Sequence, residues 1–155
     1  MDDGTKCLFT DDERLAVTAV AAMVIPASEE YGVPGADDPA IVDNILVDAS
    51  RRPEQLKDAL AALDALAQKE AGMPYASVSD DKRKAITSEF RKSHAGHAKL
   101  FANQTEQGYY RDDRVMRSIG LEARPPHPQG YEVEQGDWSL VDPVKKKAPF
   151  YRPAD

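Results

Sequence analysis

The sequence predicts an all-α protein, with a helical domain over 1–120 followed by an irregular arm over 121–155. Apolar residues recur at spacings of three and four along most of the domain, as in helices with one buried face. Helix-start signals precede these runs, and Gly or Pro follows them. Only a short stretch, YEVEQ at 131–135, alternates in the manner of a strand. A chain of 155 residues fits one domain of this kind.

The first helix is expected to begin after Thr10. Thr10 and Glu13 have the spacing of a capping box, in which each side chain accepts a hydrogen bond from the other's backbone amide. Pro26 ends the run. The predicted buried face consists of Leu15, Ala16, Ala19, Val20, Met23 and Val24.

Two further helices are expected after a Gly- and Pro-containing loop over 28–38. Asp38 precedes Pro39 as a cap precedes the first helical position, and Pro53 repeats the device after Arg52. Gly72 and Pro74 end the third helix. The predicted apolar faces are Ile41, Val42, Ile45, Leu46 and Ala49 in the second helix, and Leu56, Ala59, Leu60, Leu63, Leu66 and Ala67 in the third.

A fourth helix is expected to start at a Ser79 cap and to continue to Gln104 or Gln107, with Gly96 weakening its middle. A short fifth helix should begin at Asp112 or Asp113 and end at Gly120. The domain thus has four main helices and a short fifth.

The C-terminal arm combines prolines with apolar and aromatic residues that a solvated tail would not need. Prolines restrict the unfolded backbone, so they favour an extended segment that binds a surface at low entropic cost. The predicted arm therefore packs on a partner. Its aromatic residues are Tyr131, Trp138, Phe150 and Tyr151.

Charge and composition exclude several classes of function. The net charge of −7 argues against a nucleic-acid partner, and the one basic run, Lys145 to Lys147, is interpreted as a solvated tail. No apolar run has the length of a membrane span. Cys7 is the only cysteine, so an internal disulfide and a cysteine-based metal cluster are both excluded.

No catalytic motif is present, and we expect neither catalytic nor cofactor-binding residues in this chain. The paired acidic residues mostly precede helices, where they stabilise the helix start. His94 and His97 lie three positions apart and leave open an alternative, a freestanding metal-binding helical domain. A second alternative is a helical adaptor whose RPPHP segment, 124–128, binds an aromatic groove.

Two stretches resemble the gluconate 2-dehydrogenase subunit 3 family. LFTDDERLAVTAVAAMVIPASEEYGVPGADDPAIVDNI, 8–45, is similar to the family's pattern of a helix, a Pro-Gly-Ala turn and a second helix. GYYRDDRVMRSIGLEARPPHPQGY, 108–131, is similar to its YY-x-D-x-R-V element followed by P-x-GY. The nearby Trp138 and the terminal Tyr-Arg extend the resemblance.

The resemblance implies a non-catalytic small subunit of a heteromeric sugar or alcohol dehydrogenase. The large subunit, a flavoprotein of the glucose–methanol–choline type, would carry FAD and the catalysis, and this chain would support its folding in a chaperone-like manner. A cytochrome partner is implied by family analogy only. Family members often carry a twin-arginine signal; this sequence has none, so we expect a cytoplasmic protein, or a periplasmic one if a signal was removed.

The predicted partner interface lies in the second stretch and the arm. Tyrosine and tryptophan bury much area at low entropic cost, which makes them typical anchors. The predicted interface residues are Tyr109, Tyr110, Arg114, Pro125, Pro126, Tyr131, Trp138, Phe150 and Tyr151.

Overall fold

The computed structural model describes residues 8–125 and 127–148. It divides into two compact units, Met1–Arg124 and Pro125–Asp155. The predicted division came after residue 120. The all-α class is confirmed: the described residues form helices and no strand, with one isolated bridge between Ser28 and Val33. The stretch 131–135 is irregular, so the strand considered there is absent.

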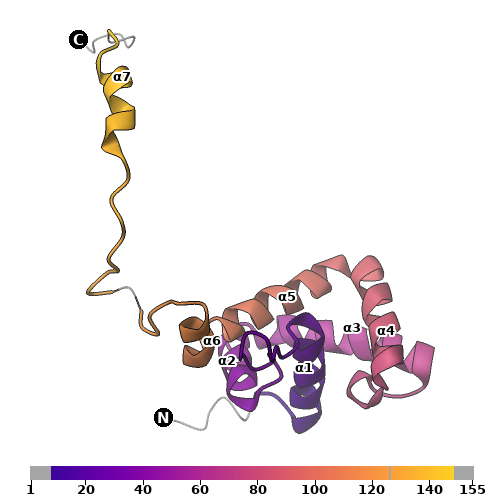
Figure 1. Ribbon diagram of the computed structural model, residues 1–155. Coiled ribbons are helices and arrows are strands. Elements are labelled where there is room, and N and C mark those ends of the chain that lie inside the picture. Colours follow the sequence, from indigo (N-terminus) through magenta and orange to yellow (C-terminus); the bar gives the residue numbers. More distant parts are fainter. Residues whose placement is uncertain (1–7, 126, 149–155) are drawn as a thin grey trace. The chain divides into compact units, whose positions relative to one another are not determined.

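The first unit contains six α-helices and one 3-10 helix among its described residues (Figure 1). They are α1 (Asp11–Val24), α2 (Pro39–Ala49), α3 (Pro53–Ala71), the 3-10 helix η2 (Tyr75–Ser77), α4 (Asp80–Ser93), α5 (Ala95–Tyr109) and α6 (Asp113–Ser118). Helix α5 packs against α1, α2, α3 and α4, most extensively against α2. The first unit is therefore organised around α5.

Most predicted helix starts are confirmed in atomic detail. The Thr10 hydroxyl accepts from the Glu13 amide at 3.1 Å, and the Glu13 carboxylate accepts from the Thr10 amide at 2.7 Å. Asp38 caps α2 by accepting from the Ala40 amide at 3.0 Å. Ser79 precedes α4 as expected, but its side chain makes no capping hydrogen bond. The cap prediction was therefore correct in position and wrong in mechanism at Ser79.

The buried face of α1 differs from the predicted one. Leu15 is 58% exposed, whereas Val17 is only 4% exposed. Helix α1 packs against α2, α3, α5 and η2, so neighbours on several sides select its buried residues. The buried residues of α1 are Ala16, Val17, Val20 and Ala21.

The prediction of one continuous fourth helix was wrong, because the structure has two helices, α4 and α5, in its place. Helix α4 ends at Ser93, and α5 begins at Ala95 after His94 adopts φ −131° and ψ 50°. In one straight helix, Phe90 and Phe101 would lie about 16 Å apart along the axis. Their ring centroids are instead 6.0 Å apart, and both rings are buried. The change of direction at His94 thus brings two aromatic side chains into one core.

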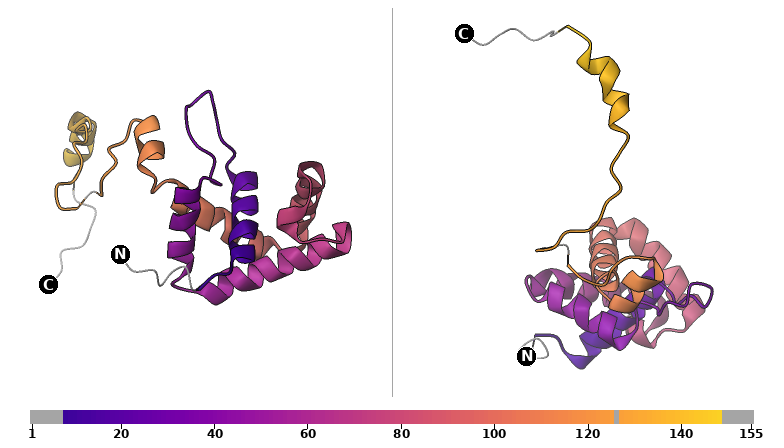
Figure 2. Two further views of the ribbon diagram at one scale, coloured as in Figure 1. Left: turned by 90° about the horizontal axis from the view of Figure 1, so that it is seen from below. Right: turned by 60° about the vertical axis from the view of Figure 1, so that its left-hand side comes forward.

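The loop between α1 and α2 extends beyond the ends of both helices in the left view of Figure 2. The Ser28–Val33 bridge closes its tip, and the Ala36 amide donates to the Ile25 carbonyl at 2.9 Å. Its base is therefore fixed to the end of α1.

The second unit contains η3 (Trp138–Val141) and α7 (Asp142–Lys145) in its described part. These two short helices were not predicted. Asp137 caps η3 by accepting from the Ser139 amide at 3.0 Å, and Pro143 lies in the first turn of α7. Neither element buries a residue. No helix in the described part of the chain is both long and apolar enough to cross a membrane.

Candidate functional site

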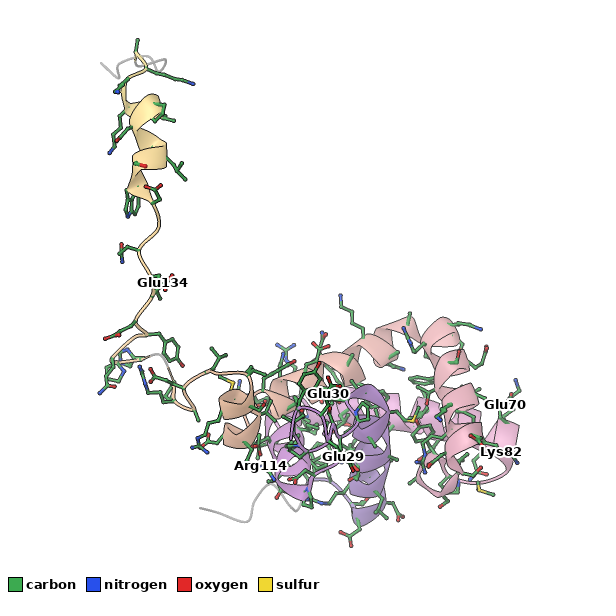
Figure 3. The ribbon with its side chains drawn as sticks, viewed as in Figure 1. Glu29, Glu30, Glu70, Lys82, Arg114 and Glu134 are labelled. Carbon is green, nitrogen blue, oxygen red and sulfur yellow. The ribbon has the colours of Figure 1, made fainter. Side chains whose placement is uncertain are left out.

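The two motif-bearing stretches meet in the first unit, through contacts that span 75 and 76 positions of the chain. The Tyr109 hydroxyl donates to the Pro34 carbonyl at 3.2 Å. The Arg114 guanidinium donates to the Asp38 carboxylate at 2.9 and 3.0 Å. We call this region the motif corner; it comprises residues 34–38 and 109–115. Figure 3 labels Arg114 within it.

The turn in the motif corner leaves no room for a side chain at Gly35. A Cβ atom there would lie 2.9 Å from the Ala27 amide nitrogen and 2.2 Å from the Asp37 carboxylate. The following residue, Ala36, is fully buried. Close backbone approach therefore explains the Gly, and burial in a small space explains the Ala of the Pro-Gly-Ala pattern.

Arg114 joins the starts of two helices. Asp38 caps α2, and Asp112 caps α6 by accepting from the Arg114 amide at 2.8 Å. The guanidinium also donates to Asp112, at 3.0 Å from Nε and 2.8 Å from Nη2. These hydrogen bonds lower the pKa of both Asp38 and Asp112, against a smaller opposing effect of burial. Both carboxylates are therefore anionic caps held by one cation.

The predicted interface residues of the motif corner differ in accessibility. Tyr109 is 5% exposed and belongs to the core, which leaves little of it for a partner to touch. Tyr110 is 52% exposed, and its ring packs edge-on against Tyr109 at 5.4 Å between centroids. The Arg114 side chain is half exposed, with its guanidinium engaged by the two carboxylates. Tyr110 is thus the aromatic residue that this corner presents to solvent.

The other predicted interface residues lie in the second unit. Tyr131 is 42% exposed, Trp138 is 68% exposed, and Pro125 is exposed. Pro126, Phe150 and Tyr151 lie outside the described residues. For all of these, the role in an interface stays a prediction.

Of the two histidines considered as metal ligands, His94 forms the junction of α4 and α5 and His97 lies in the first turn of α5. The His94 ring stacks on Phe90 at 4.9 Å, and the His94 and His97 rings lie parallel at 6.1 Å between centroids. No group of three or more His, Cys, Asp or Glu side chains in the described residues could hold a metal ion. The junction therefore brings these histidines together as a stack of rings on Phe90.

Sequence reasoning missed the long-range partners of the arginines. Asp38 was predicted only as a helix start, and nothing in the sequence pairs it with Arg114, 76 positions later. A second such pair joins Arg111 to Asp48 of α2. The one available signal was that the Asp38 cap has no cation nearby in the sequence, while an Asp-x-Arg element follows much later at 112–114. That signal could have indicated the pairing of Asp38 with Arg114.

The family comparison matches the motif corner. A family model described as gluconate 2-dehydrogenase subunit 3 matches residues 11–126, about three-quarters of the chain. The chain belongs to the gluconate 2-dehydrogenase subunit 3 family. No curated protein and no solved structure matched the chain in the same comparisons.

Family membership accounts for the first unit and leaves most of the second outside the match. The turn, α2, α5 and the Asp112–Arg114 element all lie within residues 11–126, whereas Tyr131 and Trp138 lie beyond them. The family description names a dehydrogenase subunit, so the chain is related to components of multi-subunit dehydrogenases. A subunit of such an assembly needs a surface for its neighbours.

Proposed function

We propose that this chain is the non-catalytic small subunit of an FAD-dependent sugar or alcohol dehydrogenase, and that it stabilises a catalytic subunit of the glucose–methanol–choline type. The match of residues 11–126 to a dehydrogenase subunit family carries the proposal. FAD and the reacting groups would belong to the large subunit. This chain would contribute binding surface and support the folding of its partner.

The apolar side chains of the second unit support a role in binding. Between 131 and 144, six large apolar or aromatic residues are exposed, although a chain of this length can bury most of its apolar side chains. Clusters of this kind are typical of protein–protein contacts. The exposed residues are Tyr131, Val133, Trp138, Leu140, Val141 and Val144.

Trp138 is the strongest anchor candidate in this cluster. It is 68% exposed at the start of η3, where Asp137 fixes the backbone through its bond to the Ser139 amide. A tryptophan side chain on a fixed backbone loses little entropy on binding and buries a large area. Truncation of such an anchor typically costs about 2 kcal/mol or more of binding free energy.

Co-expression with a candidate catalytic subunit, a flavoprotein of the glucose–methanol–choline type, tests the proposal. The large subunit alone should give less soluble protein, less bound flavin and less dehydrogenase activity than the pair. Equal yield, flavin content and activity with and without this chain would rule out a stabilising subunit.

Two variants then locate the binding surface. Truncation after Arg124 removes the second unit at the division that the structure shows, and should abolish assembly. Trp138→Ala should weaken assembly, whereas Lys146→Ala, also exposed in this unit, should not. If the truncated chain assembles as well as the full chain, the second unit is not the binding surface.

A further inference from the structure

A cavity of about 440 Å³ opens among α1, α4 and α5 in the first unit. Its volume lies in the range of small-molecule sites, roughly 300–1,000 Å³. The residues that line it come from these helices, from Leu63 of α3 and from Tyr75 of η2. They are Val20, Met23, Val24, Leu63, Tyr75, Thr87, Phe90, Arg91, Ala95, Ala98, Lys99, Phe101 and Ala102.

The change of direction between α4 and α5 forms this cavity. The two helices meet at His94 and diverge from it, as Figure 1 shows. Alanines occupy the cavity face of α5 at 95, 98 and 102, and they leave space where larger side chains would fill it. The cavity is thus a consequence of the local sequence.

The inner wall of the cavity is apolar. Leu63 and Phe90 are each 2% exposed, and Phe101 is 6% exposed, so the wall consists of core side chains. Met23 adds a flexible, polarizable side chain of the type that adapts to varied ligands. An apolar group that entered here would be removed from water on several sides.

The two hydroxyl groups of the wall, those of Tyr75 and Thr87, already have partners. The Thr87 hydroxyl donates to the Arg83 carbonyl at 2.8 Å, so the Tyr75 hydroxyl, 2.6 Å away, is the donor to Thr87. Neither hydroxyl therefore keeps a hydrogen to donate to a ligand. A ligand recognised here must carry its acceptor groups at the cavity edge.

The charged side chains that line the cavity are both positive. Arg91 and Lys99 line it, and no Asp or Glu does, although the chain as a whole carries a net charge of −7. Within the described residues, neither cation forms an ion pair, whereas Arg83 and Arg114 do. Two unpaired cations beside an apolar wall favour an anion with an apolar body.

A second cavity, between α3 and α4, gives a useful contrast. Its volume is about 750 Å³, and it is lined by Lys69 and Lys82 together with Glu70 and Glu89. Because this lining carries charges of both signs, it favours neither anionic nor cationic ligands. A lining whose charged residues are all cationic is therefore specific to the cavity at Arg91 and Lys99.

We propose that the cavity among α1, α4 and α5 binds an amphipathic carboxylate. Its hydrocarbon body lies against Phe90, Phe101 and Met23, and its carboxylate pairs with Arg91 and Lys99. All of its lining residues belong to the first unit and none to the motif corner, and the proposal does not depend on the proposed dehydrogenase partner.

Three probes with the same ten-carbon chain test the proposal on the full-length protein, by NMR titration at submicellar concentrations. Decanoate should bind saturably and shift the resonances of Met23, Ala95 and Ala102. Decanol should bind about tenfold more weakly, since it loses the charge-assisted hydrogen bonds. Decyltrimethylammonium should bind more weakly still. Equal affinity for decanoate and decyltrimethylammonium would overturn the proposal.

Variants separate the charges from the cavity. Arg91→Gln combined with Lys99→Gln should reduce decanoate affinity to that of decanol, whereas Lys92→Gln, in the same turn as Arg91 but outside the lining, should leave it unchanged. Ala95→Trp fills the cavity from an exposed position and should abolish binding of both probes. Unchanged decanoate binding in the double variant or in Ala95→Trp would refute the site. Resonances that shift on simple dilution would show that a second copy occupies the cavity, which also overturns the proposal.

Discussion

The guanidinium of Arg114 donates two hydrogen bonds to the carboxylate of Asp38, at 2.9 and 3.0 Å, across 76 positions of the chain. Asp38 at the same time caps α2, and Arg114 follows the Asp112 cap of α6. One side chain therefore fixes α6, which is only six residues long, to the start of a larger helix. This contact gives a structural reason for the Asp-x-Arg pattern in the family element.

Replacement of Arg114 should lower the melting temperature of the protein. Arg114→Lys keeps the charge but loses the planar fork that reaches both carboxylates, so we expect a partial loss of stability. Arg114→Ala should lose more, because two helix caps would then lack their common cation. Arg117→Ala is the control, since among the described residues Arg117 pairs only with the exposed Asp113 of its own helix. Equal melting temperatures for Arg114→Ala and Arg117→Ala would show that the long-range contact contributes nothing.

Acid should weaken this contact in a defined direction. Hydrogen bonds from Arg114 lower the pKa of Asp38 and Asp112 in the folded state below the unfolded value of about 3.9. The unfolded state therefore binds more protons in this range. The resulting stability is complete above about pH 4 and is lost as the pH falls through the lower folded values.

The measurement compares wild type with Arg114→Ala in thermal unfolding from pH 6 to pH 2.5. The gap between their melting temperatures should be constant down to about pH 4 and should then narrow, because protonated carboxylates no longer benefit from the cation. Arg117→Ala serves again as the reference for general acid effects. A gap that widened on acidification would contradict the assignment.

Local signals in the sequence made the helix starts predictable. The features that depend on long-range packing could not be predicted from these signals. Thr10 and Asp38 marked helix starts correctly because their side chains cap neighbouring backbone amides, and Pro53 did so because its fixed φ suits the first helical position. The break at His94 was not predictable, since it depends on Phe90 and Phe101 meeting in one core. The helical spacing of the apolar residues is the same for one long helix and for two shorter ones, so it does not distinguish them.

The same limit applies to the candidate site. The motif stretches are recognisable by their resemblance to the family. The Gly of the turn predicts a loop, but the sequence does not show the close backbone approach that requires it. Tyr109 lies eight positions after Phe101 on the buried face of α5, whereas Tyr110 is the residue that follows this helix. The predicted helix ended at Gln104 or Gln107, so its periodicity was not extended to Tyr109.

Gly108 should tolerate no side chain. A Cβ atom there would lie 2.5 Å from Ile45 Cγ1 and 3.1 Å from the Ile45 amide nitrogen, so α5 would have to move away from α2. Overpacking of this kind costs about 1–3 kcal/mol of unfolding free energy, and we expect Gly108→Ala to fall in that range. Chemical denaturation monitored by circular dichroism measures it.

Gly96 in the same helix supplies the matched control. A Cβ atom there meets nothing within 4 Å, and the backbone has an ordinary helical φ. Gly96→Ala should therefore stabilise the protein by about 0.4–1 kcal/mol, through the restricted unfolded chain. The two substitutions are chemically identical and should have opposite signs. If both substitutions stabilise the protein, α5 and α2 do not approach each other as closely at Gly108 as the structure shows.

Tyr109→Phe should remove the hydrogen bond that ties the end of α5 to the loop before α2. The hydroxyl donates to the Pro34 carbonyl at 3.2 Å, and burial raises the pKa of Tyr109, so the donor stays protonated throughout the neutral range. We expect a loss of about 1 kcal/mol in unfolding free energy, and the same loss at pH 5 and at pH 9. This constancy distinguishes the bond from the acid-sensitive contact of Arg114. Tyr110→Phe is the control, since no hydrogen bond of the Tyr110 hydroxyl is found in the described chain. Equal losses of unfolding free energy in the two variants would show that the Tyr109 hydroxyl contributes no stabilising hydrogen bond.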